Sequence, residues 1–185
     1  MVTVGFVVEG PSDKKLVESE SFQRWMPAAT ANCSSRKITA FVDKLKIQAK
    51  NPDKVIVLAD LDPDRCAPCI SKRKEIIGND GIDLIVIARK ALESWFLADT
   101  EAMRRWTGNK GFYEDQPETL SGIPWDRLKE IGRDRDRGRG PGASKIIFAR
   151  KFIRHQGFDV RRAAEHPACP SARYFVERLR ALRAG

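Results

Sequence analysis

The sequence predicts an α/β protein whose mainly parallel sheet is flanked by helices. Three short runs of β-branched and aliphatic residues read as buried strands, and segments with helical spacing of apolar residues separate them. The runs are Val2–Val8, Lys54–Ala59 and Leu84–Ala88. Strands that alternate with helices form right-handed crossover units, and such a sheet is covered on both faces. With 185 residues, 42% of them hydrophobic, the chain can form one compact domain or a domain with an appendage.

The first helices follow from capping residues and apolar spacing. The strand at Val2–Val8 ends in Glu9-Gly10-Pro11, and Ser12 is predicted to cap a helix from Asp13 to Met26 with one apolar face. A second helix is predicted over Ser35–Lys50. After the second strand, a short helix near Ser71–Ile77 leads through a Gly-Asn-Asp-Gly turn into the third.

From Thr100 onward the chain lacks strand-like runs and is predicted to be helical. The helices are expected near Glu101–Trp106, Trp125–Ile131, Ser144–His155, Val160–Glu165 and Ser171–Leu182. We therefore divide the chain into an α/β catalytic core at residues 1–100 and a basic, mainly helical extension at residues 101–185 that packs on the core.

The basic charge is concentrated in the second half of the chain. The formal net charge is +9, with 15 basic and 14 acidic side chains in residues 1–100 but 19 and 11 in residues 101–185. A basic region joined to a nearly neutral one favours a polyanionic partner such as nucleic acid, although an Arg-rich helical surface in solvent has the same composition.

Cellular location and cysteine chemistry follow from composition. No stretch reaches the ~20 apolar residues of a membrane span, and no cleavage site follows the first strand, so we expect a soluble, cytoplasmic protein without a membrane partner. Four cysteines are too few for an extracellular disulfide framework. Cys66 and Cys69 have the spacing of half a zinc site, but no second pair of ligands has matching spacing, so turn-located structural cysteines are the default.

Acidic residues follow each predicted strand. Glu9 leaves the first strand, Asp60 and Asp62 leave the second, and Glu93 comes after the third. Parallel strands end at one edge of a sheet, which is where open α/β folds bind ligands, so these carboxylates should converge. Asp60 and Asp62 are two residues apart on extended backbone and therefore point to the same side; Asp64 follows Pro63, which bends the chain.

A cluster of carboxylates favours a divalent cation. Neighbouring carboxylates repel one another, and a bound cation relieves that repulsion. Ligands that are all oxygen suit Mg²⁺ or Mn²⁺, which share their coordination with substrate phosphates. The alternative is a loop in which aspartates cap helices and form Asx-turns. For Glu93, the alternative is a helix residue in solvent.

At these residues the sequence resembles a known family. Val7-Val8-Glu9-Gly10-Pro11-Ser12-Asp13 is similar to the first signature of TOPRIM domains, and Leu58-Ala59-Asp60-Leu61-Asp62-Pro63-Asp64 is similar to the second. The segments 88–99 and 167–182 further resemble a family of small bacterial TOPRIM-like proteins, domain of unknown function 4276. The chain also resembles the nuclease half of the overcoming-lysogenization-defect (OLD) proteins. A TOPRIM/Rossmann-like sheet is the fold that this implies.

The resemblance implies Mg²⁺-assisted phosphodiester chemistry and assigns roles to individual residues. Glu9, Asp60 and Asp62 match the catalytic, metal-binding positions, and Glu9 is also a candidate general acid or base. Glu93 and Asp99 match a motif of the small family only. The candidate metal ligands are Glu9, Asp13, Asp60, Asp62, Asp64 and Glu93. Strand passage and primer synthesis are not expected, because a suitably placed tyrosine, a zinc ribbon and a polymerase extension are missing from this sequence.

The predicted activity is hydrolysis of a nucleic-acid phosphodiester by one or two Mg²⁺ or Mn²⁺ ions, with DNA favoured over RNA. The candidate backbone-binding residues are Arg89, Lys90, Arg133, Arg135, Arg137, Arg139 and Lys145. In OLD proteins the other half is an ATPase. The resemblance therefore implies a separately encoded SMC- or ABC-type ATPase as partner and a place in defence against phage or in repair.

Two other functions remain open. A TOPRIM fold can bind nucleic acid or a partner protein without catalysis. An Asp-x-Asp at a strand end also occurs in phosphatases with an aspartyl nucleophile, which would make the chain a small-molecule phosphohydrolase. The basic excess and the Glu9-Gly10 pair have no clear use in that second activity.

Overall fold

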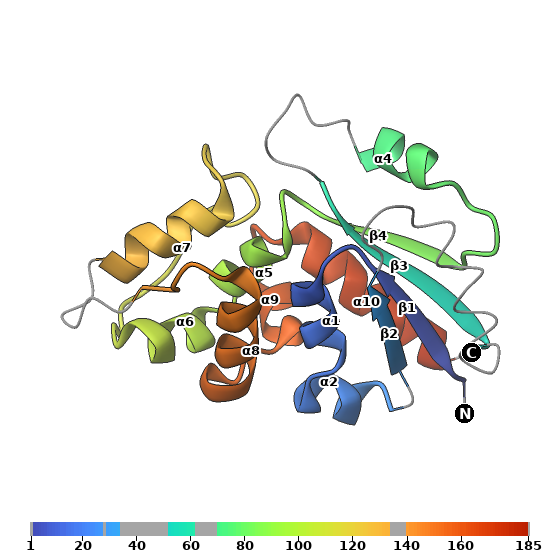
Figure 1. The fold of residues 1–185 in the computed structure, drawn as a ribbon, viewed down its shortest axis with the longest axis horizontal. Coiled ribbons are helices and arrows are strands. Elements are labelled where there is room, and N and C mark those ends of the chain that lie inside the picture. The colour runs from blue at the N-terminus through green and yellow to red at the C-terminus, as the bar shows by residue number, and fades with distance from the viewer. Residues whose placement is uncertain (1, 28, 34–51, 62–69, 134–139, 185) are drawn as a thin grey trace.

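The computed structural model of the chain describes residues 2–27, 29–33, 52–61, 70–133 and 140–184 (Figure 1). The described strands are β1 (Val4–Val8), β2 (Ala29–Cys33), β3 (Lys54–Asp60) and β4 (Leu84–Ala88). The described helices are α1 (Pro11–Val17), α2 (Glu20–Trp25), α4 (Ile70–Ile77), α5 (Leu92–Ala98), α6 (Thr100–Thr107), α7 (Pro124–Arg133), α8 (Lys145–Gln156), α9 (Val160–Glu165) and α10 (Pro170–Ala184).

The four strands form one parallel sheet in the order β2-β1-β3-β4. In the register of this sheet Val8 lies between Cys33 and Leu58, and Asp60 lies beside Ala88. Because the strands are parallel, their carboxyl ends meet at one edge. The predicted α/β architecture is confirmed, and the three predicted strands and the C-terminal helices match the structure to within a few residues.

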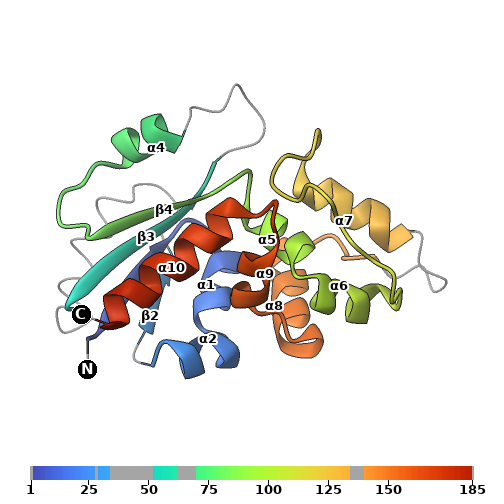
Figure 2. The same cartoon turned by 180° about the vertical axis from the view of Figure 1, so that it is seen from behind.

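Each face of the sheet has its own core. Alternate side chains such as Phe6, Ile56 and Val86 point to one face, where α1, α5 and α10 cover them. The side chains between them, including Val57 and Ile87, point to the other face, where α4 covers them with Ile77. Figure 2 shows α10 lying along the first face, with α4 on the opposite side of the sheet.

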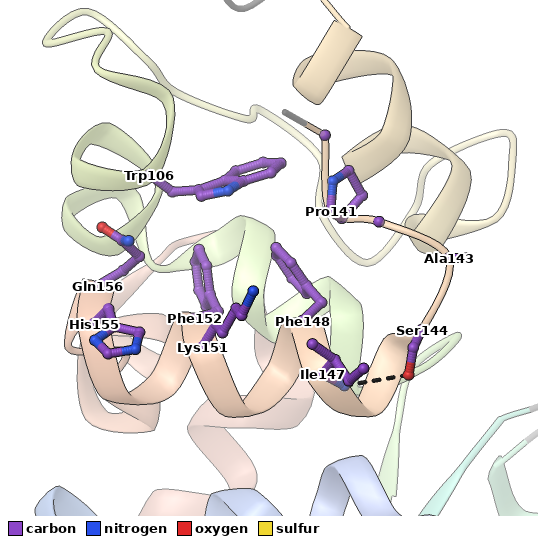
Figure 3. Close-up of a pocket in the computed structure, with 12 residues that line it drawn as sticks. Trp106, Pro141, Ala143, Ser144, Ile147, Phe148, Lys151, Phe152, His155 and Gln156 are labelled. Carbon is purple, nitrogen blue, oxygen red and sulfur yellow. Dashed lines mark hydrogen bonds between the residues drawn. The ribbon is translucent and has the colours of Figure 1, made fainter. Parts of the chain in front are cut away.

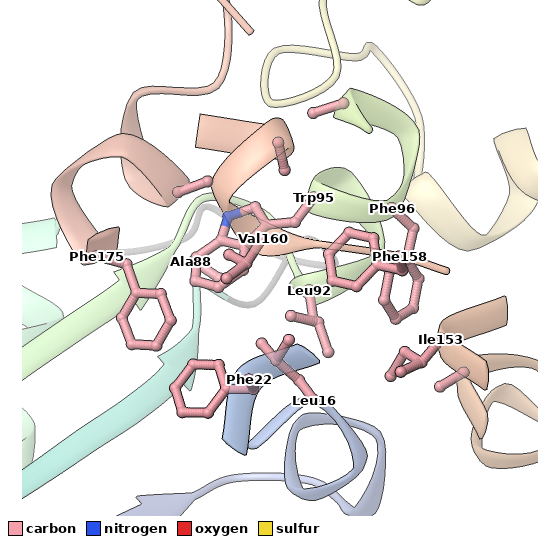
Figure 4. Close-up of a cluster of buried hydrophobic side chains, with 14 of the residues drawn as sticks. Leu16, Phe22, Ala88, Leu92, Trp95, Phe96, Ile153, Phe158, Val160 and Phe175 are labelled. Atoms are coloured by element: carbon pink, nitrogen blue, oxygen red, sulfur yellow. The ribbon is translucent and has the colours of Figure 1, made fainter. Parts of the chain in front are cut away.

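The larger core joins the sheet to the C-terminal half of the chain. Side chains from β4, α1, α2, α5, α8, α9 and α10 converge in it (Figure 4). Phe175 of α10 packs against Phe6 and Trp95, with ring centroids 6.1 and 5.3 Å apart. The division of the chain at residue 100 stays a prediction. None of the described helices has the length and apolar character that crossing a membrane requires.

The predicted single helix from Asp13 to Met26 is wrong. The structure breaks it at Ser19, whose hydroxyl accepts a hydrogen bond from Phe22 N (3.3 Å) and so starts α2 as a separate helix. The N-cap of α1 is Gly10 rather than Ser12, and Pro11 takes the first helical position, where its missing N–H costs nothing.

Two elements were not predicted, and one prediction cannot be compared. Strand β2 has no continuous apolar run because it lies at one end of the described sheet and is only half-buried, so its sequence lacks the signal of a central strand. Helix α5 is buried on every side, which removes the polar face that reveals a helix. The helix expected over Ser35–Lys50 lies outside the described residues.

Candidate active site

The carboxyl edge of the sheet brings four carboxylates together. Glu9 follows β1, Asp13 lies in the first turn of α1, Asp60 ends β3, and Glu93 lies in the first turn of α5 after β4. All four line one open pocket of about 660 Å³, which is closed on its far side by the start of α7 and the start of α8. The convergence expected from the parallel topology is thus present for Glu9, Asp60 and Glu93, while Asp62 lies outside the described residues.

Glu9 is held by an arginine that the sequence analysis did not single out. Arg73 Nη2, on α4, lies 2.9 and 3.1 Å from the two oxygens of Glu9. Glu9 Oε2 also accepts a hydrogen bond from Asp60 N (3.0 Å). Arg73 Nε is buried without a partner among the described residues. Arg73 is therefore the counter-ion of Glu9 in this structure. The sequence alone could not identify it, because Lys72, Arg73 and Lys74 are consecutive basic residues and no pattern shows which of them faces the site.

Asp13 is buried, and its environment favours the protonated form. Only 4% of the residue is exposed, and its Oδ2 accepts a hydrogen bond from Gly10 N (2.8 Å). Burial, with smaller contributions from the charges of Glu93 and Glu9, raises the pKa of Asp13 from 3.8 to about 7. The hydrogen bond from Gly10 opposes this change without cancelling it.

The ionised form of Asp60 is disfavoured for the same reasons as that of Asp13. Its Oδ1 accepts a hydrogen bond from Leu92 N (3.1 Å), which ties the end of β3 to the start of α5. Burial of the carboxylate raises the pKa of Asp60 well above its usual value, and the charges of Asp13, Glu93 and Glu9 raise it further. Asp13 and Asp60 therefore share a pocket in which neither carboxyl has a cationic partner of its own among the described residues, although Lys145 lies nearby.

Glu93 is paired with Lys145, which alone among the predicted nucleic-acid contacts in the described ranges lines the pocket. Only 4% of Glu93 is exposed, and Lys145 Nζ lies 3.3 Å from its Oε1. Lys145 begins α8, and its ammonium also lies 5.9 Å from the ring centroid of Trp125 on α7. Trp125 was not among the predicted site residues, because one aromatic residue in a helix reads as core.

The remaining predicted contacts lie elsewhere. Lys90 adopts a left-handed backbone (φ 63°), and its ammonium donates to the carbonyls of Leu120 and Gly122, so it ties a loop instead of facing the pocket. Arg89 lines a separate small pocket beside Tyr174, and Arg133 is exposed at the end of α7. Asp62, Asp64, Cys66, Cys69, Arg135, Arg137 and Arg139 lie outside the described residues.

Asp99, which the resemblance linked to Glu93, serves a different part of the fold. It is fully buried and caps α6 by accepting a hydrogen bond from Ala102 N (3.2 Å). Its two carboxylate oxygens also accept hydrogen bonds from Arg162 Nε and Nη2, at 2.9 and 2.7 Å. It does not line the carboxylate pocket. Its contacts are those of a residue that joins α6 to α9.

The donor set suits a hard divalent cation. Asp13 and Asp60 each accept a hydrogen bond through one oxygen, and the second oxygen of each accepts none from a described residue. A dication would relieve the repulsion that raises both pKa values. Within the described ranges, however, no three Asp, Glu, His or Cys side chains are already arranged around one point.

The raised pKa of Asp13 predicts a particular pH dependence of stability. The folded state binds a proton that the unfolded state releases between pH 3.8 and about 7, so this contribution to stability is present at low pH and lost as the pH rises through that range. In EDTA, the melting temperature of Asp13→Asn should therefore rise relative to wild type between pH 4.5 and 8.

Asp53 provides a control of opposite sign. The backbone N–H of Thr3 lowers the pKa of Asp53, so its contribution to stability is lost as the pH falls. The Asp53→Asn variant should lose stability relative to wild type as the pH rises to about 4, and it should run parallel to wild type between pH 4.5 and 8, where Asp53 is ionised in both the folded and the unfolded state. If Asp13→Asn instead ran parallel to wild type between pH 4.5 and 8, as Asp53→Asn should, the raised pKa of Asp13 would be refuted.

Comparison with known proteins agrees with this fold. A family model described as a domain of unknown function (DUF4276) matches residues 8–180. Among solved structures, the C-terminal region of the Burkholderia pseudomallei OLD protein is similar, with a TM-score of 0.51, 15% sequence identity and 97% of both chains covered. A search of curated proteins finds no significant match. The predicted TOPRIM/Rossmann-like α/β fold and the predicted resemblance are confirmed.

Proposed function

The chain belongs to the DUF4276 family, and from the acidic pocket of its TOPRIM-like sheet we propose that it is a nuclease that hydrolyses nucleic-acid phosphodiesters with Mg²⁺ or Mn²⁺. The observation that carries the proposal is the group of four carboxylates at the carboxyl edge, two of them with raised pKa values. Such a group is costly unless a cation occupies it, and phosphodiester hydrolysis is a reaction that uses the cation.

The chain's own residues would divide the work as follows. Asp13 and Asp60 offer oxygens that no described residue occupies, and Glu9 would join them once Arg73 is displaced. Asp62 and Asp64 remain sequence-based candidate ligands. A bound divalent cation supplies Lewis-acid polarisation of the phosphodiester and activation of the attacking water. Lys145 sits at the mouth of the pocket, where its charge can offset negative charge on the phosphate.

Nucleic acid is the substrate class that the charge distribution supports. Helix α8 leaves the pocket with Lys145 and Lys151 and contains no acidic residue. A cationic helix beside an acidic metal pocket suits a phosphate backbone better than a small phosphomonoester. A separate ATPase partner remains an implication of the resemblance to OLD proteins.

The test is cleavage of supercoiled plasmid, linear DNA and structured RNA with Mg²⁺, Mn²⁺ or EDTA. We expect nicking or cutting that requires the metal. Failure on all three nucleic acids, with hydrolysis of p-nitrophenyl phosphate, would favour the phosphohydrolase. Failure on every substrate, with retained nucleic-acid binding in EDTA, would favour the binding module or an effector that needs its partner.

Arg73 gives a prediction that needs no turnover. Because its guanidinium occupies both oxygens of Glu9, a cation must displace it, and Arg73→Ala should bind Mn²⁺ several-fold more tightly than wild type. Titration followed by electron paramagnetic resonance of free Mn²⁺ measures this directly. Lys74→Ala is the matched control, since Lys74 carries the same charge on the same helix but lies over the Tyr174 ring. Equal tightening in both variants would contradict a specific role for the Arg73–Glu9 pair.

A further inference from the structure

A second pocket adjoins the carboxylate pocket. It has a volume of about 500 Å³ and lies where α6, α8 and the segment 140–144 meet (Figure 3). Ser144 lines both pockets, so the two lie next to each other at the start of α8. Its lining residues are Trp106, Gly140, Pro141, Gly142, Ala143, Ser144, Ile147, Phe148, Lys151, Phe152, His155 and Gln156.

The wall of this pocket is aromatic and its lip is aliphatic. Trp106 meets Phe148 edge to face at 5.2 Å between ring centroids, and Phe148 stacks on Phe152 at the same separation. These rings are held in place because their other sides belong to the core. Ile147 stands at the mouth with 47% of its surface exposed, so its side chain is accessible to a ligand that enters the pocket.

The charge of the pocket selects for an anion. None of its lining residues is acidic, and Lys151 and His155 stand on the exposed side of α8 that borders it. An apolar wall with cations at the rim fits a flat ring that carries a phosphate. It fits a cationic or a wholly apolar ligand less well.

We propose that this pocket receives an unpaired base of the nucleic acid whose backbone crosses the carboxylate pocket. The inference rests on the proposed function, and it deepens that function by making single-stranded or unpaired nucleic acid the preferred substrate. Lys145 and Lys151 are six residues apart on α8, about 9 Å along its axis, so they can contact successive phosphates of one strand. The base between those contacts would turn toward Ile147 and the rings behind it.

The first test measures binding of fluorescently labelled oligothymidine in EDTA, so that cleavage plays no part. Ile147→Asp puts a charge at the mouth of the pocket at an exposed position of α8, and it should weaken binding about tenfold. Lys151→Glu is the second variant. Its control is Arg150→Glu, the same reversal of charge one residue earlier, at a side chain that lines a different pocket.

The second test asks whether the base itself is bound. Oligonucleotides with single abasic positions should bind wild type several-fold more weakly at one position, and Ile147→Asp should lose that difference. A Lys151→Glu effect larger than that of Arg150→Glu, together with a lost abasic penalty, supports the pocket. Equal effects of the two charge reversals, or an abasic penalty that Ile147→Asp retains, overturns it.

The two proposals fail separately. If base-dependent binding is found in EDTA but no metal-dependent cleavage occurs on any substrate, the pocket stands and the nuclease falls. If cleavage occurs but duplex and single strands bind equally and the pocket variants have no effect, the nuclease stands and the pocket falls. An apolar peptide that competes for the pocket while oligothymidine does not would also overturn the assignment to a base.

Discussion

Metal-dependent cleavage is expected to fall by about a hundredfold or more in Asp60→Asn, while the metal-free fold becomes no less stable. Asparagine keeps an Oδ1 acceptor for Leu92 N, so the tie between β3 and α5 survives. It removes a charge from a carboxyl whose pKa burial and three neighbouring carboxylates raise. Loss of activity without loss of stability is the signature of a residue placed for a ligand and not for the fold. Cleavage rates and thermal melting, each with and without Mg²⁺, measure both parts.

Asp126 offers the matched control for that substitution. It lines the same pocket, but its carboxylate is exposed and pairs with Lys129 at 2.9 Å. Asp126→Asn should keep cleavage near the wild-type rate and should leave Mg²⁺-induced stabilisation unchanged. Equal losses of cleavage in Asp60→Asn and Asp126→Asn would mean that any negative charge at the pocket supports cleavage. Asp60 would then have no particular role in holding a cation.

Asp99→Asn is expected to destabilise the protein by about 3 kcal/mol while sparing the chemistry of molecules that remain folded. The Asp99 carboxylate accepts from Ala102 N, Asp159 N and two nitrogens of Arg162, and it is wholly buried. An amide in its place would direct N–H hydrogens at some of these N–H donors, and it would remove the buried counter-charge of Arg162. Denaturant unfolding gives the loss in stability.

A control at Glu101 separates buried from exposed charge. Glu101 also lies near Arg162, at 3.6 Å, but 62% of its side chain is exposed. Glu101→Gln should change the free energy of unfolding by less than about 1 kcal/mol. If Asp99→Asn instead kept its stability and lost cleavage at temperatures where it is folded, Asp99 would belong to the chemistry, as its match to the motif of the small TOPRIM-like family suggested.

Local patterns were sufficient for most of the secondary structure. Continuous β-branched runs predicted β1, β3 and β4, because a strand buried on both faces needs apolar side chains on both. Pattern failed at β2, whose Ala-Thr-Ala-Asn-Cys sequence is held by pairing with Val4–Val8 and not by its own burial. It also failed at Ser19, where the cap starts a new helix inside a continuous apolar pattern.

The sequence by itself determined the convergence of Glu9, Asp60 and Glu93, because parallel strands necessarily end at one edge and each of these residues follows a strand. Only the tertiary structure decided which basic side chains pair with these carboxylates. Arg73 reaches Glu9 across 64 residues of sequence and Lys145 reaches Glu93 across 52, while Lys90, close to the edge in sequence, turns to the carbonyls of a loop. A long basic side chain can pair with any carboxylate or carbonyl within its reach. Its partner therefore depends on the packing of distant elements, which no local sequence pattern records.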